Sequence, residues 1–197
     1  MRNFINLSEN GYDIMSFLDQ CDKKNIHNRN IDVATYSWDD DHVLVVGELK
    51  EQRYVGFINN FGERIVPGIY HHMKIELLID TTTKTIKDVA VSLPRVPRGD
   101  CPAMVSSLDQ IKGMDITRGF SSKIRKMVGG NKGCVHLNTL LLTMAPAAVQ
   151  GAWINIAWQR KEAVSPDPQT GRHLVDSCWA WRKDGPLVAE KGIQVDK

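Results

Sequence analysis

The sequence lacks a strong net charge, a long apolar run and an apolar leader. Its formal net charge is only +2 over 197 residues, and so small an excess does not indicate a nucleic-acid partner. It contains no run of eighteen apolar residues, which argues against a membrane span. Residues 1–9 have no apolar core of the kind that signal peptides carry. We therefore expect a cytoplasmic protein that binds neither nucleic acid nor a membrane.

Cysteine is also scarce, and its spacing is uninformative. Cys21, Cys101, Cys134 and Cys178 lie far apart and form no Cys-x-x-Cys pair. In a chain of this length without a signal peptide, we expect reduced thiols or metal ligands rather than disulfides. The sequence has no Walker loop, nucleophile elbow or zinc-protease helix. No motif therefore indicates a reaction class, a substrate or an oligomeric state.

Apolar residues make up 42% of the chain, which is enough to build a hydrophobic core. Runs rich in β-branched and aromatic residues predict antiparallel strands at 31–38, 42–50, 53–58, 71–80 and 85–93. Helical patterns follow at 101–111, 116–128 and 140–158. We expect an α+β domain over residues 29–185, in which an antiparallel sheet is followed by helices packed on one of its faces. A polar N-terminal segment, residues 1–28, precedes this domain, and residues 186–197 form a tail.

Three finer expectations concern the helices and the polar segments. Pro146 should kink the last helix or divide it in two, and Trp153 and Trp158 should pack in the core or line a pocket. Asp100 should cap the helix at 101–111. A short helix is predicted at 14–21 and a polar loop at 161–172.

The most informative stretch is the glycine-rich segment at residues 129–138, which carries Cys134 and His136. Its glycines permit a tight turn, and the apolar run that follows predicts a helix. Cys134 and His136 are thus expected at a helix N-terminus, where exposed amide groups favour a thiolate. Such a turn is typical of a metal or nucleophile site, although a plain joint between loop and helix gives the same pattern. Both residues can ligate one metal only if the turn at Cys134 is not yet helical.

Other sulfur and imidazole groups lie at similar junctions. Cys101 begins a predicted helix, and His71 and His72 lie where a loop meets a strand. Junctions commonly present functional residues, and sulfur with imidazole is a ligand set for zinc or iron. The alternative interpretation is that Cys101 and Cys134 are small buried residues and that the histidines lie at the surface.

Several blocks of sequence resemble a bacterial family known as domain-of-unknown-function 2889. The blocks are residues 67–73, 93–102, 108–113 and 129–137, together with Glu48-Leu49-Lys50 and Asp176-Ser177-Cys178. The glycine–cysteine–histidine block is the most specific of them, and the resemblance covers roughly residues 30–185. It implies a shared fold, whereas the family name carries no activity.

Residues 67–150 also resemble the iron–sulfur scaffold proteins of the IscU and SufU type. Cys101 and Cys134 match the second and third cysteines of these scaffolds, and His71 falls near their aspartate. Ile69 stands about where their first cysteine would be, so the resemblance implies a different, mixed-ligand site. That site would consist of His71, Cys101 and Cys134, with His136 or Cys178 as a fourth ligand.

These observations lead to a hypothesis with three alternatives. The leading hypothesis is a protein that binds zinc or iron through cysteine and histidine and acts as an enzyme on a small molecule. The metal would polarise the substrate or activate water, and His72 or His136 would transfer protons. The alternatives are a non-catalytic carrier of metal or sulfur, a metal-free enzyme with Cys134 as nucleophile, and a binding module with inert thiols.

Overall fold

The computed structural model describes residues 22–117, 119–159 and 171–194. The chain forms two units, residues 1–157 and residues 158–197. The helix predicted at 14–21, Cys21 and most of the loop predicted at 161–172 lie outside the described residues.

The first unit is built on an antiparallel sheet of four strands in the order β1-β2-β5-β6. The strands are β1 (His27–Ser37), β2 (His42–Arg53), β5 (Gly68–Asp80) and β6 (Ile86–Arg95). The sequence predicted each of them, although all four begin or end a few residues away from the predicted limits. The strand predicted at 53–58 is reduced to β3 (Phe57–Ile58), which pairs with β4 (Arg64–Ile65) in a separate two-stranded hairpin.

One face of the sheet is apolar because alternate residues of a strand point to opposite faces. On β2 and β5 the buried positions follow this alternation. Their side chains form the floor of the hydrophobic core and are at most 1% exposed: Val43, Val45, Leu49, Met73, Ile75, Leu77 and Ile79.

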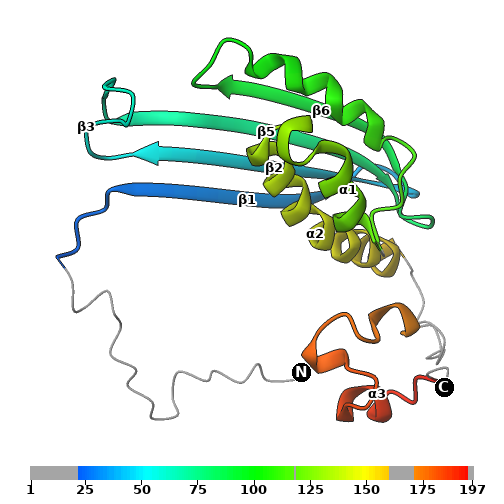
Figure 1. Cartoon of the computed structure of the whole chain (residues 1–197). Helices are drawn as coiled ribbons and strands as arrows, with labels where there is room; N and C mark the ends of the chain where they lie inside the picture. The colour runs from blue at the N-terminus through cyan, green and yellow to red at the C-terminus, as the bar shows by residue number, and fades with distance from the viewer. Residues whose placement is uncertain (1–21, 118, 160–170, 195–197) are drawn as a thin grey trace. The chain divides into compact units, whose positions relative to one another are not determined.

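The helices that follow the sheet cover this apolar face (Figure 1). They are η3 (Cys101–Ile111), α1 (Phe120–Val128), the short η4 (Gly130–Lys132) and α2 (Val135–Gln159). The predicted α+β class is therefore confirmed. The first helix is a 3₁₀ helix, and Asp100 does not cap it with its side chain, contrary to our expectation. The reason is local, because Asp100 has helical dihedrals (φ −88°, ψ −14°) instead of the extended conformation of a capping residue.

Helix α2 is a single helix of 25 residues that includes Pro146, so the expected division in two does not occur. It lies close to the sheet, because a Cβ atom added to Gly151 would lie 2.3 Å from Cγ2 of Thr35 on β1. Trp153 and Trp158 are 50% and 74% exposed, so neither is a core residue. By length and composition α2 could cross a membrane, but core helices of soluble proteins have the same properties.

The second unit contains short elements only in its described part. These are η5 (Arg172–Leu174), η6 (Trp179–Trp181) and α3 (Pro186–Glu190). Cys178 immediately precedes η6 and is exposed. Helix α3 lies within the segment predicted as a tail.

Candidate metal centre

A row of polar residues crosses three strands at the end of the sheet's helix-covered face. Arg29 on β1 is the cross-strand neighbour of Glu51 on β2, and Glu51 is the neighbour of His71 on β5. Glu51 continues the buried alternation of Val43, Val45 and Leu49 and is only 9% exposed. The pleat of the sheet therefore places a carboxylate at the end of an otherwise apolar row.

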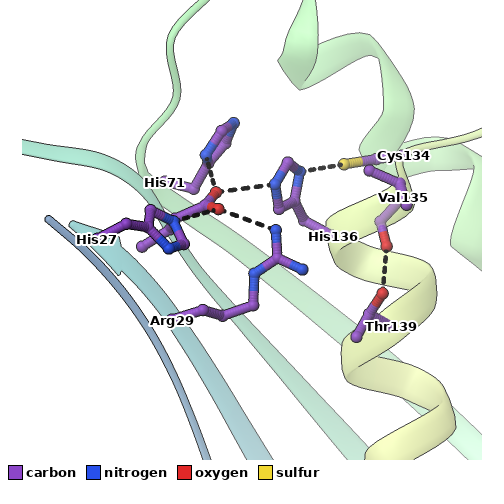
Figure 2. Close-up of polar contacts among 8 residues, drawn as sticks. His27, Arg29, His71, Cys134, Val135, His136 and Thr139 are labelled. Carbon is purple, nitrogen blue, oxygen red and sulfur yellow. Dashed lines mark hydrogen bonds and ion pairs between the residues drawn. The ribbon is translucent and has the colours of Figure 1, made fainter. Parts of the chain in front are cut away.

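Both oxygens of the Glu51 carboxylate are in contact with basic side chains. Oε1 accepts a hydrogen bond of 2.9 Å from the Arg29 guanidinium. The same oxygen lies 2.9 Å from Nε2 of His27. Oε2 lies 2.6 Å from Nδ1 of His71 and 3.0 Å from Nε2 of His136. Figure 2 shows these four side chains converging from β1, β5 and α2.

The glycine-rich stretch brings His136 to this point. A Cβ atom on Gly133 would lie 2.3 Å from the carbonyl oxygen of Val128, so only glycine lets the chain pass so close to the end of α1. The amide of Asn138 donates to the carbonyl of Cys134 at 2.9 Å, which makes Cys134 the residue that precedes the first turn of α2. The prediction that Cys134 and His136 lie at a helix N-terminus is thus confirmed.

The two histidines of the centre lie face to face. The ring centroids of His71 and His136 are 3.8 Å apart, and the ring planes differ by 26°. Nδ1 of His71 is buried and, despite its 2.6 Å approach to Glu51, has no partner with hydrogen-bond geometry among the described residues. A buried nitrogen that lies close to a carboxylate oxygen, but off the hydrogen-bond direction, suits a ligand atom that shares a cation with that oxygen.

Glu51, His71 and His136 form a group in which one ligand atom from each residue lies within 4.8 Å of the others. Two imidazoles with one carboxylate is a ligand set found in catalytic zinc sites and in non-haem iron sites. Arg29 and His27 hold the second carboxylate oxygen and so fix the orientation of Glu51.

The electrostatics of the centre favour the deprotonated forms of Glu51 and His136. Burial tends to raise the pKa of the Glu51 carboxyl, but hydrogen bonds from His27 and Arg29, with the charges of Arg29 and His136, bring it to about 2. Burial and the neighbouring His71 lower the pKa of His136, and they outweigh the opposing effect of Glu51. A carboxylate and a neutral imidazole are the forms that bind a metal.

Cys134 lies on the other side of His136. Its Sγ is 3.8 Å from Nδ1 of His136, whereas Nε2 of the same ring faces Glu51. Figure 2 shows the imidazole of His136 between Cys134 and His71. The thiol is half-buried and adjoins the group of three without belonging to it.

The structure thus brings together two of the predicted ligands, His71 and His136. Cys101 is half-buried at the start of η3 and is not a member of the group. Cys178 belongs to the second unit, so its role as a ligand stays a prediction. His72, predicted to transfer protons, lies beside Glu48 and not Glu51, because consecutive residues on β5 face opposite sides of the sheet.

Sequence reasoning missed Glu51, Arg29 and His27. Glu51 carried a signal, because it directly follows the apolar odd-numbered positions 43–49 of β2. A carboxylate at such a position is buried and needs cationic or metal partners. His27 lies in the segment that the sequence assigned to the polar N-terminal region, and Arg29 lies just before the first predicted strand. Only the pairing register of β1 reveals their position.

Comparison with known proteins gives a family but no activity. No curated protein and no solved structure matches the chain, so the resemblance to iron–sulfur scaffold proteins has no support from these comparisons. One family model, described as "Protein of unknown function (DUF2889)", matches residues 27–150. That range begins at His27 and includes every member of the centre. Because the model covers more than half of the chain, this protein belongs to the DUF2889 family.

Proposed function

We propose that the protein binds one divalent metal ion, zinc or iron(II), through Glu51, His71 and His136. The observation that carries this proposal is the convergence of three ligand atoms within 4.8 Å of one another, all from buried or half-buried residues. Arg29 supports the proposal because it donates a hydrogen bond to the other oxygen of the Glu51 carboxylate, as the outer partners of metal ligands do.

We further propose that the bound metal serves an enzyme reaction on a small molecule. Three protein ligands leave at least one coordination position open, which is the feature that separates catalytic from structural zinc sites. A metal with an open position activates water or polarises a substrate carbonyl. In this proposal His136 is a metal ligand and not a proton-transfer group, since its Nε2 faces the metal.

Titration of metal-free protein with Co²⁺ and Zn²⁺ tests the proposal. We expect saturation at one ion per chain, and a cobalt spectrum without the strong near-ultraviolet band of thiolate coordination. Substitution of any one of the three ligands, by Glu51→Gln, His71→Ala or His136→Ala, should remove tight binding, whereas Glu48→Gln should not. Unchanged affinity in all three ligand variants would contradict the proposal.

One observation favours a second candidate, a metal-free enzyme with Cys134 as nucleophile. The thiol of Cys134, the imidazole of His136 and the carboxylate of Glu51 form a chain of contacts. Sγ of Cys134 is 3.8 Å from Nδ1 of His136, and Nε2 of His136 is 3.0 Å from Oε2 of Glu51. In this arrangement Nδ1 of His136 takes the thiol proton while Glu51 accepts a hydrogen bond from Nε2, as in other cysteine–histidine pairs. Rapid alkylation of Cys134 by iodoacetamide, while Cys101 stays unreacted, would favour this candidate. His136→Ala should then slow the alkylation of Cys134 at least tenfold. Slow alkylation of Cys134 would exclude it.

A further inference from the structure

A cavity that is separate from the metal centre lies where β5 begins and β6 ends. It has a volume of about 480 Å³ and is lined by nine residues from positions 66–70, 72 and 95–97. None of Glu51, His71 and His136 lines it. Its size falls in the usual range for pockets that bind small molecules.

The cavity wall combines polar and aliphatic surface in similar amounts, and local contacts stabilise its shape. Val66, Ile69 and Val96 contribute aliphatic side chains, and prolines follow the first and last of them. The hydroxyl of Tyr70 donates to the carbonyl of Val66 at 2.9 Å. The Arg53 guanidinium lies 3.9 Å from the centre of the Tyr70 ring. The tyrosine is therefore fixed between the loop and a cation before any ligand arrives.

Positive charge in this region is not neutralised. Within the described part of the chain, neither Arg95 on the cavity wall nor Arg53 has a carboxylate partner. Glu48, the carboxylate in contact with His72, is shared with Lys50 at 3.1 Å. A guanidinium that has no carboxylate partner among the described residues and lies beside aliphatic side chains is an arrangement that binds an acid with an apolar body.

We propose that this cavity binds a small organic molecule with one carboxylate group and an aromatic or branched aliphatic body. Arg95 would bind the carboxylate through two parallel hydrogen bonds, since a guanidinium matches that geometry. The aliphatic wall would bury the rest of the molecule. A phosphate dianion fits less well, because Arg95 is the only unpaired cation among the lining residues, and Glu48 lies beside His72.

The test measures binding of simple acids to protein that has been stripped of metal and desalted, so its result does not depend on the metal proposal. The probes are benzoate, phenylacetate and 4-methylpentanoate, each paired with its neutral primary amide, and inorganic phosphate. Binding is followed by isothermal titration and by backbone amide NMR shifts. We expect at least one acid to bind saturably and to shift amides at residues 66–72 and 95–97, and its amide to bind at least tenfold more weakly.

Arg95→Gln should weaken binding of that acid by about 10- to 100-fold, which corresponds to the loss of a charge-assisted hydrogen bond. The matched control is Arg98→Gln, which removes a nearby exposed arginine that does not line the cavity. The proposal is overturned if no acid binds, if Arg95→Gln binds as the wild type does, or if phosphate binds as tightly as the best acid.

Discussion

The imidazole rings of His71 and His136 are stacked, with centroids 3.8 Å apart, although one comes from strand β5 and the other from helix α2. Two protonated imidazoles at this distance would repel each other. The pKa of His136 is lowered first by burial and second by the neighbouring His71. Glu51 approaches a nitrogen of each ring with the same oxygen, Oε2. A divalent cation between the three groups would bind this oxygen and one nitrogen of each ring together.

The first prediction concerns the carboxylate ligand. Glu51→Gln keeps the size of the side chain but removes the charge that attracts a cation. We expect the affinity for Zn²⁺ to fall at least 100-fold, because loss of an outer-shell partner alone typically costs 10- to 100-fold. Competition with a chromophoric chelator measures this. Glu48→Gln, on the same strand but the opposite face, is the control and should bind zinc as the wild type does.

The second prediction concerns Arg29, which donates a hydrogen bond to Glu51. Arg29→Gln should weaken zinc binding by about 10- to 100-fold, because Glu51 loses the partner that orients it. The matched control, Lys50→Gln, removes a cation that pairs with Glu48 instead. An Arg29→Gln protein with wild-type zinc affinity would show that the ion pair serves folding only.

The third prediction concerns pH and the metal-free protein. The Glu51 carboxyl has a pKa of about 2 in the fold, against an ordinary pKa of 4.5. Its stabilising contribution is therefore complete above pH 4.5 and is lost as the pH falls toward 2. Linkage gives a loss of about 1–2 kcal/mol in the free energy of unfolding between pH 7 and pH 3.5 from this group. Protonation of His136, whose pKa is also lowered, removes stability in the same direction, starting near its ordinary pKa of 6.5.

Urea unfolding at several pH values measures this dependence. In Glu51→Gln the fall in stability between pH 7 and pH 3.5 should be smaller than in the wild type by about 1–2 kcal/mol. Parallel pH profiles for the two proteins would contradict the burial and pairing of Glu51.

The fourth prediction concerns the close approach of α2 to the sheet. Alanine normally stabilises a helix relative to glycine by about 1 kcal/mol. At Gly151, however, the added Cβ would lie 2.3 Å from Cγ2 of Thr35. We expect Gly151→Ala to lower the free energy of unfolding by about 1–3 kcal/mol through overpacking, measured by urea unfolding at neutral pH. The double variant Gly151→Ala/Thr35→Ala should recover part of this loss; no recovery would place the strain elsewhere.

The sequence predicted the sheet and the helices because their signals are local. Val43, Val45 and Leu49 alternate with half-buried positions, and a period of two defines a strand with one buried face. The helix after Cys134 was predicted from its length and apolar content. It continues through Pro146, however, because packing of residues such as Met144 and Ala148 against the sheet outweighs a local breaker.

The candidate site was predicted only in part, because the pairing register of the strands brings Arg29, Glu51 and His71 together. His71 and His136 stood out by residue type and by their place at junctions. Glu51 did not stand out. No nearby residue in the sequence indicates that strand pairing places Arg29 of β1 on one side of it and His71 of β5 on the other. The cysteines were expected to be ligands because sulfur binds zinc and iron. The structure places Cys134 against the nitrogen of His136 that faces away from Glu51, and a ligand role for the cysteines stays a prediction.

The most direct test of the metal centre is elemental analysis of the protein purified without oxygen and without chelator, compared with His136→Ala purified in the same way. The proposal predicts close to one zinc or iron per chain in the wild type and a small fraction of that in the variant. Circular dichroism of both proteins checks that the variant is folded. A folded wild-type protein that contains no zinc or iron, and takes up neither when it is offered, would contradict the account.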